Sequence, residues 1–292
     1  MKHKSGFVNI IGHPNVGKST LMNALVGEKL SIITSKAQTT RHRIMGIVNG
    51  DDFQIVYSDT PGIVKPHYKL HESMMKFVDA AMEDADIFLL VTENKDVPFE
   101  DDLVQRLNQL NKPVILILNK VDLMEQQEVK QKLTELEARF PTAIILPVSA
   151  LHKFNLDKLF DALLDKLPES PAYYPKDELT DRSMRFFISE IIREKILLYY
   201  KQEIPYSAEV SVDEYKEKPG ITLITATIYV ARESQKAIIL GHQGRSIKGL
   251  GMAARKDIEE FIEGKSYLEL RVKVSKDWRD DPRQLKRFGY DL

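Results

Sequence analysis

The sequence predicts two domains: an α/β domain with a doubly wound, mostly parallel sheet, then a smaller α+β domain. The chain has 292 residues, which exceeds the usual size of a single hydrophobic core. Short apolar runs alternate with helical stretches in the first half, whereas the second half contains strands with one polar face. A proline-rich segment separates the two patterns.

The first domain is expected to cover residues 1–167. Five short apolar runs predict its buried strands, at 7–11, 53–57, 87–91, 114–118 and 144–148. Amphipathic segments between or after the later runs, such as 127–140 and 156–167, predict helices. Buried strands that alternate with helices are typical of a parallel sheet covered on both faces.

The second domain is expected at residues 181–292, after a linker at 168–180. Three prolines within residues 168–175 exclude a regular helix or a central strand there. Beyond the linker, apolar spacing predicts a helix near 182–200, a helix ending at Leu240 and another over about 245–262. Alternating residues predict strands over 208–212, 224–230 and 268–274. The order is helix, strand, strand, helix, helix, strand.

Composition limits the classes of partner. The formal net charge is −1, from 42 basic and 43 acidic residues, so binding to nucleic acid has to be local. The chain has no cysteine, which excludes disulfides and thiolate chemistry and fits a reducing cytoplasm. The longest apolar runs are too short to cross a bilayer and the N-terminus lacks a signal pattern, so we expect neither an integral membrane nor a secreted protein.

Residues 12–19 predict a phosphate-binding loop. They follow the first expected strand and open a helix that continues through Leu25. Glycines let backbone amides converge on phosphates, and the helix N-terminus adds partial positive charge. We expect Lys18 to reach the β- and γ-phosphates and Ser19 to offer its hydroxyl to Mg²⁺. The full motif is Gly12, His13, Pro14, Asn15, Val16, Gly17, Lys18 and Ser19.

A second motif, Asp59-Thr60-Pro61-Gly62, follows the strand at 53–57. Asp59 is expected to hold Mg²⁺ through water, and the Gly62 amide to contact the γ-phosphate. Without the phosphate-binding loop, a capping aspartate before a Pro-Gly turn would explain the same residues. Ile63 stands where Ras-like GTPases carry a glutamine that orients the attacking water. An isoleucine cannot position water, so we expect slow intrinsic hydrolysis.

The third motif, Asn119-Lys120-Val121-Asp122, follows the strand at 114–118 and indicates selection of guanine. The Asp122 carboxylate can accept hydrogen bonds from N1–H and the 2-amino group of guanine, whereas adenine lacks both donors. A polar site left unpaired by the wrong base discriminates by roughly 10⁴ or more. Asn119 is expected to support the pocket and Lys120 to lie along the base. Further along the chain, Ser149-Ala150-Leu151 can supply the Ala150 amide to the guanine carbonyl.

Over about residues 5–167 these motifs resemble the translation-factor-related class of GTPases. The resemblance implies a Mg²⁺-binding threonine in a mobile loop before the second strand. Gln38-Thr39-Thr40-Arg41 occupies that place, and we choose Thr40 over Thr39 as the Mg²⁺ ligand, although a polar surface loop would contain the same residues. Asn15 resembles the residue that, in a subset of the class, helps to hold a K⁺ ion that activates hydrolysis.

A glycine-rich loop in the second domain indicates RNA binding. Gly241-His242-Gln243-Gly244 lies between the two later helices, where such a loop can clamp a sugar-phosphate backbone. Residues 236–256 contain five basic side chains and no acidic one, whereas a solvated helix face would more often mix signs. The expected RNA-binding residues are Lys236, Gly241, His242, Gln243, Gly244, Arg245, Lys248 and Arg255, with Lys256 beside them.

The second domain resembles a type II KH domain, and the two halves together resemble the bacterial Era family of GTPases over essentially the whole chain. The typical family loop has a basic residue between its glycines, where this chain has His242 and Gln243. The resemblance implies a GTP/GDP switch that binds the 3′ region of small-subunit (16S) ribosomal RNA and assists maturation of the small ribosomal subunit. It also implies peripheral association with the inner membrane, and a monomer is the default state.

Two other functions fit parts of the sequence. The second domain could bind a protein, which would make the chain a signalling GTPase without an RNA partner. A P-loop kinase that phosphorylates a small molecule would share the phosphate-binding loop, but the guanine-selecting residues 119–122 argue against it.

Overall fold

The computed structural model describes residues 3–36, 38–95, 99–109 and 111–290. Its contacts divide the chain into two compact units. Unit 1 comprises Met1–Ser31, Thr40–Lys65 and Met74–Asp181, and unit 2 comprises Ile32–Thr39, Pro66–Ser73 and Arg182–Leu292. Unit 2 therefore includes two short segments from the first half of the sequence. The domain limits at 167 and 181 stay a proposal.

Unit 1 is built on a sheet of six strands within its described residues, in the order β2-β3-β1-β4-β5-β6. All neighbouring strands are parallel except β2, which pairs antiparallel with β3. The strands are β1 (Lys4–Ile11), β2 (Ile44–Asn49), β3 (Phe53–Asp59), β4 (Ile87–Thr92), β5 (Val114–Leu118) and β6 (Ile144–Pro147). The predicted mostly parallel α/β sheet is confirmed.

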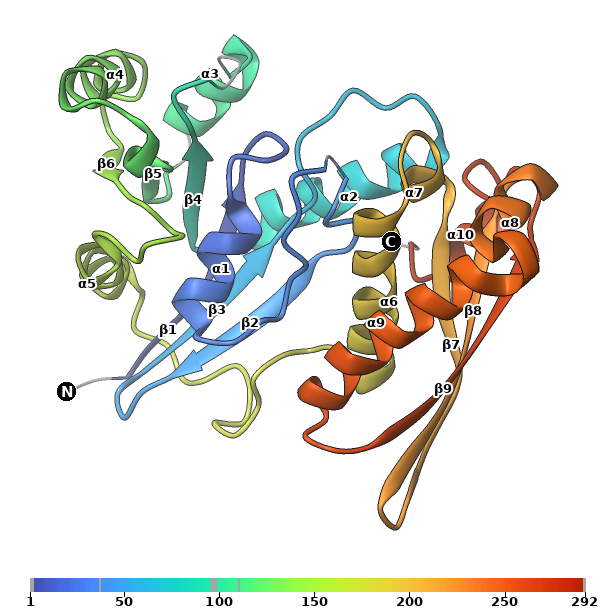
Figure 1. Ribbon diagram of the computed structural model, residues 1–292. Helices are drawn as coiled ribbons and strands as arrows, with labels where there is room; N and C mark the ends of the chain where they lie inside the picture. Colours follow the sequence, from blue (N-terminus) through green and yellow to red (C-terminus); the bar gives the residue numbers. More distant parts are fainter. Residues whose placement is uncertain (1–2, 37, 96–98, 110, 291–292) are drawn as a thin grey trace. The chain divides into compact units, whose positions relative to one another are not determined.

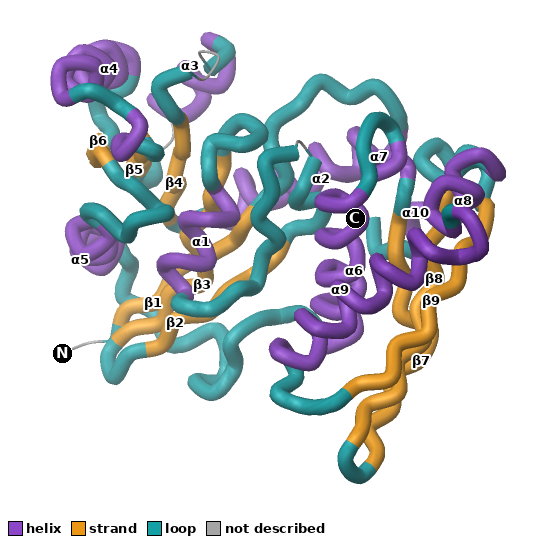
Figure 2. Tube along the Cα trace, in the orientation of Figure 1, coloured by secondary structure: helices purple, strands orange, loops and turns teal. Residues whose placement is uncertain are grey.

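Helices cover both faces of this sheet (Figures 1 and 2). They are α1 (Lys18–Val26), α2 (Lys69–Asp84), α3 (Asp101–Gln109), the 3-10 turn η1 (Val121–Leu123), α4 (Gln126–Arg139) and α5 (Leu156–Lys166). On one face, side chains of α2, α3 and α4 form a core with apolar residues of β4 and β5. On the other, α1 lies in front of the strands in Figure 1. Burial on both faces explains why β4 and β5 are apolar along their whole length.

The edge strand β2 was not predicted. Its residues Ile44–Asn49 include Gly46, and they fall between the expected loop at 38–41 and the expected strand at 53–57, where no element was predicted. The expected linker region covers the outer edge of this strand: Ile47 N donates to Leu179 O at 2.8 Å, and Thr180 Oγ1 donates to Met45 O at 2.7 Å. These bonds satisfy backbone groups that an open edge would expose.

The described part of unit 2 has a sheet of three strands, β7-β8-β9, in which β7 and β8 are antiparallel and β8 and β9 parallel. The predicted order of helices and strands is confirmed, with two short helices added. The elements are α6 (Met184–Tyr199), α7 (Ile204–Ser207), β7 (Glu209–Lys218), β8 (Ile221–Val230), α8 (Glu233–Leu240), the 3-10 turn η2 (His242–Gly244), α9 (Arg245–Phe261), β9 (Ser266–Val274) and α10 (Pro282–Arg287).

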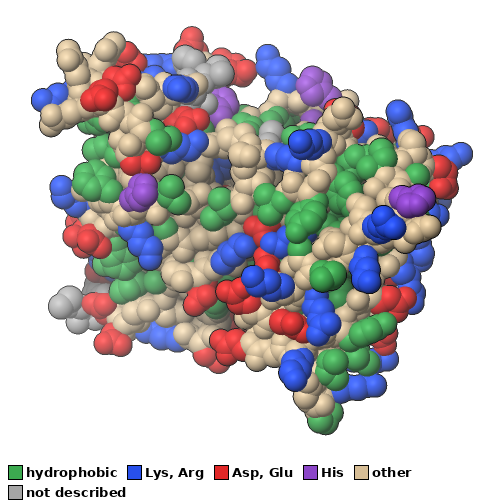
Figure 3. All heavy atoms as spheres, in the orientation of Figure 1, with side chains coloured by type: hydrophobic (Ala, Val, Ile, Leu, Met, Phe, Trp, Pro, Cys, Tyr) green, Lys and Arg blue, Asp and Glu red, His purple; other side chains and the backbone are tan. Residues whose placement is uncertain are grey.

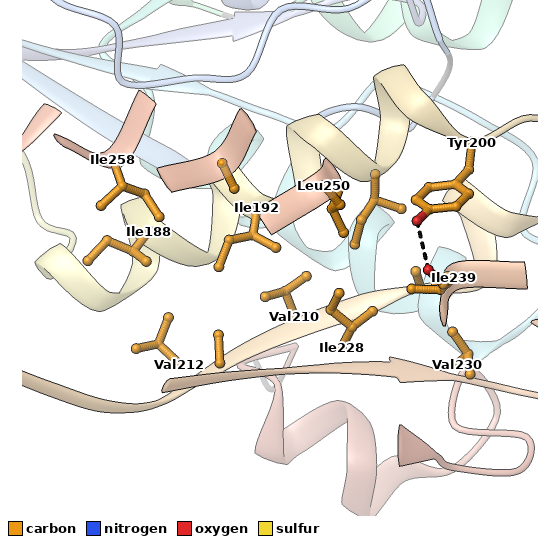
Figure 4. Close-up of a cluster of buried hydrophobic side chains, with 14 of the residues drawn as sticks. Ile188, Ile192, Tyr200, Val210, Val212, Ile228, Val230, Ile239, Leu250 and Ile258 are labelled. Carbon is orange, nitrogen blue, oxygen red and sulfur yellow. Dashed lines mark hydrogen bonds between the residues drawn. The ribbon is translucent and has the colours of Figure 1, made fainter. Parts of the chain in front are cut away.

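The core of unit 2 lies between the sheet and α6, α8 and α9 (Figure 4). Ile192 of α6, Ile228 of β8 and Ile258 of α9 are fully buried in it. The opposite side of β8 is covered by the C-terminal segment, where Phe288 packs against Tyr229 with ring centroids 5.1 Å apart. This packing positions α8 and α9, and hence the turn between them.

Candidate nucleotide site and nucleic-acid interface

The phosphate-binding loop connects β1 to α1, and two of its glycines are required by geometry. Gly12 has φ +151°, and an added Cβ would lie 2.3 Å from the Val91 carbonyl oxygen. Gly17 has φ +97°, and its Cβ would lie 2.2 Å from Asn119 Nδ2. Both conformations are ones that side chains with a Cβ rarely adopt. The loop is therefore closely packed against the ends of β4 and β5.

Lys18 folds back over this loop. Its Nζ donates to the carbonyl oxygens of Gly12 at 3.0 Å and His13 at 2.8 Å. The side chain is buried, so its cation is held inside the loop rather than in solvent. A fixed, buried ammonium group attracts phosphate oxygens more strongly than a hydrated one does.

Three oxygen-bearing side chains meet at the start of α1. Ser19 Oγ donates to Asp59 Oδ2 at 2.6 Å and lies 2.9 Å from Thr40 Oγ1. Thr40 Oγ1 donates to the same Asp59 oxygen at 3.4 Å. Asp59 is the last residue of β3, whose parallel pairing with β1 brings its carboxyl end beside the phosphate-binding loop. The structure thus brings together the three residues expected at Mg²⁺.

Asp59 is fully buried, and its Oδ1 has no hydrogen-bond partner among the described residues. Burial raises the pKa of Asp59, while Lys18 and the Ser19 hydroxyl oppose that shift. An unpaired, buried carboxylate oxygen costs free energy unless a proton or a cation binds it. Hard oxygen ligands of this kind are those that Mg²⁺ prefers, so the residues fit the ion.

Thr39 and Thr40 have different surroundings. Thr39 Oγ1 lies 2.7 Å from Thr34 Oγ1 and donates to Lys36 O at 2.6 Å, within the segment 32–39. Thr39 Oγ1 is therefore committed to its own segment, whereas the Thr40 hydroxyl faces Ser19 and Asp59.

The motif after β3 also contacts the phosphate-binding loop. Thr60 Oγ1 donates to Ile10 O at 2.8 Å, and Ile63 N donates to Gly12 O at 3.2 Å. A Cβ on Gly62 would lie 2.8 Å from atoms of Pro14, so glycine permits this close approach. Pro61 lies between these contacts, and the Ile63 side chain offers no polar atom to a water molecule.

One amide connects the predicted guanine-binding residues to the phosphate-binding loop. Asn119 Nδ2 donates to Val16 O at 2.8 Å, and its Oδ1 accepts from Ala150 N at 3.0 Å. Asn119 and Ser149 are buried. Asn119, which we expected to support the pocket, therefore bridges the end of β5, the phosphate-binding loop and the turn after β6.

The flanking residues of these motifs differ in exposure. Lys120 has φ +61°, and its Nζ donates to Asn15 O at 2.6 Å. Asp122 lies in the 3-10 turn η1, which begins at Val121. Leu151, the last residue of the motif after β6, is exposed.

Sequence reasoning missed three contacts around the site. Glu93 pairs with Lys120 Nζ at 2.6 Å, and its position directly after the apolar run of β4 was an available signal. His152 Nε2 lies 3.7 Å from Asp122 Oδ2. The His13 ring stacks on Phe99 with centroids 5.0 Å apart, a contact that periodicity cannot reveal because Phe99 lies in a loop.

The glycine-rich loop of unit 2 connects α8 to α9, and three of its four residues have positive φ values. Gly241 and Gly244 have positive φ values of 67° and 75°, and Gln243 has φ 53°. A Cβ on Gly241 would lie 2.5 Å from Ser246 Cβ, whereas nothing lies within 4 Å of a Cβ on Gly244. The His242 and Gln243 side chains are exposed at the tip of this loop.

The basic residues predicted at the RNA interface lie on the two helices, α8 and α9, that flank this loop. Arg245, Lys248, Met252 and Arg255 follow helical spacing along α9, and all four are exposed. Lys236 lies on α8, and Arg255 Nε pairs with Glu259 at 2.9 Å. In Figure 3 basic and hydrophobic side chains lie intermixed on the visible face of unit 2. Such a mixture suits a ligand with both phosphates and bases.

Other site classes lack support in the part of the chain that the structure describes. Within it, no three His, Cys, Asp or Glu residues are grouped so as to hold a metal ion. Across the same residues, no helix combines the length and apolar character needed to cross a membrane.

Comparisons with known proteins agree with both parts of this description. A family described as a 50S ribosome-binding GTPase matches residues 7–120, and the KH domain family matches residues 203–279. The chain is 47% identical over 294 residues to GTPase ERA1, chloroplastic, of Zea mays, covering 99% of this chain and 71% of the relative. The chain belongs to the Era family of GTPases. Hydrolysis of GTP is accordingly its enzymatic activity.

Further relatives extend the match. GTPase ERA-like, chloroplastic, of Oryza sativa is 47% identical over 99% of this chain and 70% of its own length. A crystal structure of Era in complex with MgGDPNP and nucleotides 1506–1542 of 16S ribosomal RNA has a TM-score of 0.94 at 39% identity, over 99% of this chain and all of that one. A variant of Aquifex aeolicus Era bound to GDP and aluminium fluoride gives the same score, identity and coverage.

Proposed function

We propose that this Era-family protein is a GTP-driven switch that binds 16S ribosomal RNA near its 3′ end and assists maturation of the small ribosomal subunit. The main support for this proposal is that one chain contains two sites. The first is a GTPase site at 12–19, 59–63 and 119–122, and the second is an exposed glycine-rich loop flanked by basic residues at 236–256. An Era structure with MgGDPNP and a 16S ribosomal RNA fragment supports it.

Ser19, Thr40 and Asp59 are the proposed Mg²⁺ site. The unpaired Asp59 Oδ1 supports this assignment, as does the orientation of the Thr40 hydroxyl rather than that of Thr39. When bound, the ion neutralises charge on the β- and γ-phosphates. Lys18 and the loop amides of residues 12–17 bind the remaining phosphate oxygens, and the Gly62 amide contacts the γ-phosphate.

Turnover without a partner is proposed to be slow. Ile63 offers no group that orients water, so the attacking water depends on backbone groups and bound ions. Asn15 is the proposed contact to an activating K⁺ ion; it adopts φ +66° at the tip of the phosphate-binding loop. Single-turnover rates in KCl and in NaCl at matched ionic strength test this role, and equal rates would exclude it.

Asp122 is proposed to select guanine, supported by Lys120 and by the amide of Ala150. The RNA-binding residues are proposed to be Gly241, Gly244, the half-buried Lys236 and the exposed residues His242, Gln243, Arg245, Lys248 and Arg255. Phosphate contacts by these residues make affinity depend steeply on salt. Peripheral contact with the inner membrane, a cytoplasmic location and a monomeric state are parts of the same proposal.

The experiment that separates RNA from a protein partner replaces His242 and Gln243 together by Asp. Both side chains are exposed at the loop tip, so added carboxylates repel phosphate without disturbing the core. We expect a 16S-derived RNA to change the GTP hydrolysis rate of the wild type and to leave that of the double variant unchanged. No response of the wild type to RNA would favour the protein-binding alternative, and an equal response from both proteins would show that RNA acts outside this loop.

A further inference from the structure

The carboxyl end of α6 is bound by the segment 32–39 within unit 2. Lys36 Nζ donates to the carbonyl oxygens of Leu197 and Tyr200. The last carbonyl groups of a helix lack intrahelical partners and carry partial negative charge, so an ammonium group binds them well. Lys36 therefore acts as a C-terminal cap for α6, supplied from more than 150 residues earlier in the chain.

Tyr200, the C-cap residue that follows α6, reaches the glycine-rich loop with its side chain. Its Oη donates to Ile239 O at 3.0 Å and lies 2.8 Å from Ser246 Oγ (Figure 4 labels both Tyr200 and Ile239). Ile239 is in the last turn of α8 and Ser246 in the first turn of α9, so the two contacts bracket residues 241–244. Tyr200 is only 7% exposed, which restricts it to this position.

A second contact fixes the same segment next to the proposed Mg²⁺ ligand. The Arg193 guanidinium donates to the carbonyl oxygen of Thr39, the residue that precedes Thr40. Arg193 is fully buried, and Glu190 binds it with two hydrogen bonds of 2.7 and 2.6 Å. Because this anchor is rigid, any restraint on Thr40 acts on a segment that is already bound to α6.

We propose that Lys36 and Tyr200 are positioning residues that couple the nucleotide state to the RNA affinity of the loop 241–244, an inference that rests on the proposed function. Ordering of Thr40 by the γ-phosphate side of the site favours the contact of Lys36 with α6. The main chain of Tyr200 is then held, and its hydroxyl keeps Ile239 and Ser246 in the arrangement that binds phosphate. Hydrolysis releases Thr40, which weakens the contact of Lys36 with α6 and then the contacts of the Tyr200 hydroxyl with Ile239 and Ser246.

The test measures the Kd of a single-stranded RNA copied from the 3′ end of 16S ribosomal RNA, with the full chain loaded with GDP or with a non-hydrolysable GTP analogue at fixed salt. For the wild type we expect the two Kd values to differ by about fivefold or more. For Tyr200→Phe, which removes only the hydroxyl, we expect the ratio to fall close to one. Tyr199→Phe is the matched control: Tyr199 is 57% exposed, and its variant should keep the wild-type ratio.

Lys36→Met and the Lys36→Met/Tyr200→Phe double variant complete the cycle. If the two residues act in series, the double variant loses no more of the ratio than either single variant does. Losses that multiply would overturn the relay, as would an unchanged ratio in Tyr200→Phe or an equal fall of affinity in both nucleotide states. Absence of RNA binding by the wild type in either state would instead refute the proposed function, and the relay with it.

Discussion

Asn119 connects two parts of the nucleotide site through a single buried side-chain amide. Its two hydrogen bonds reach Val16 O and Ala150 N, so neither the phosphate-binding loop nor the turn after β6 is held independently of β5. A Cβ on Gly17 would lie 2.2 Å from Asn119 Nδ2, so only glycine leaves room for this side chain. The residue therefore organises the site even where it does not itself contact the nucleotide.

Asn119→Ala is expected to weaken GDP and GTP binding by roughly 10- to 100-fold. Each of the two buried backbone groups would lose its partner, at a cost of about 1–3 kcal/mol. A fluorescent GDP analogue measures the change in Kd. Asn108→Ala on α3, which removes one side-chain hydrogen bond to Arg139 O of α4, is the control and should bind GDP normally. Equal affinity of Asn119→Ala and wild type would contradict the bridging role.

Tyr57 is a residue whose polar atom adds no stability. It is fully buried in β3, its hydroxyl has no hydrogen-bond partner among the described residues, and burial raises its pKa. In the folded state the phenol therefore stays neutral at pH values where the unfolded chain ionises. The unfolded state then binds fewer protons, and stability falls as pH rises above the ordinary tyrosine pKa of about 10.

Tyr57→Phe is expected to raise the free energy of unfolding by roughly 1 kcal/mol at neutral pH and to reduce the loss of stability above pH about 10. Urea unfolding at neutral and alkaline pH measures both effects. Tyr229→Phe is the contrasting variant, because the Tyr229 hydroxyl accepts from Arg287 Nη2 at 2.8 Å, and it should lower stability. A destabilised Tyr57→Phe protein would show that the hydroxyl has a stabilising partner.

At the scale of elements, apolar runs predicted the buried strands well. β5 was predicted with its observed limits, and β1 and β3 each extend beyond the apolar run into polar residues, such as Lys4 and Asp59. Those ends pair by backbone hydrogen bonds, which leave no hydropathy signal. β2 was missed for a related reason: it is a short edge strand whose only strand partner is β3 among the described residues, and its other edge is covered by 179–181.

Motif spacing identified loops that the structure brings together at the candidate site, but it could not give the tertiary contacts. Lys120 with Glu93 and His13 with Phe99 each join residues about 30 or more positions apart. Such pairs depend on how the strands are ordered in the sheet, which local sequence does not encode. The contact of Lys36 with α6 is the extreme case, since nothing near Lys36 in the sequence distinguishes it from a solvated lysine.

Helix α9 contains two glycines whose substitution should separate effects on stability from effects on the proposed RNA binding. Gly249 has open space around an added Cβ, whereas a Cβ on Gly251 would lie 3.4 Å from Leu270 Cδ1 and face the sheet. Glycine within a helix costs about 0.5–1 kcal/mol relative to alanine. By helical spacing Gly249 shares the exposed face with Arg245 and Met252.

Gly249→Ala is expected to stabilise the protein by about 0.5–1 kcal/mol and yet to weaken RNA binding severalfold, because a methyl group keeps the RNA backbone away from the helix. Gly251→Ala should give similar stability without the loss of affinity. Thermal unfolding and RNA titration of both variants measure the two quantities. Unchanged affinity of Gly249→Ala would show that RNA does not approach this face.

For the whole chain, the division into units offers a physical basis for the proposed switch. The segments 32–39 and 66–73 come from between the nucleotide-binding motifs, but their contacts place them in unit 2. Leu70 N, for example, donates to Arg279 O at 2.9 Å, and the Arg279 guanidinium lies 4.7 Å from the centre of the Tyr68 ring. Segments that leave one unit and pack in another are suited to transmit the nucleotide state.

Thermodynamic linkage makes this claim quantitative. If the GTP state binds RNA more tightly than the GDP state by some factor, bound RNA must favour the GTP analogue over GDP by the same factor. The two nucleotide affinities, measured with and without RNA, therefore provide an independent check on the ratio of RNA affinities.

RNA titration of the wild-type chain in the two nucleotide states tests most directly whether the bound nucleotide controls the affinity for RNA. A single-stranded RNA from the 3′ end of 16S ribosomal RNA and a scrambled RNA of equal length are titrated at one fixed salt concentration, since phosphate contacts make affinity salt-dependent. We expect tighter binding of the cognate RNA in the GTP-analogue state and little difference between the two states with the scrambled RNA. Equal affinity in both states, or no binding in either, would contradict a GTP-switched RNA-binding protein.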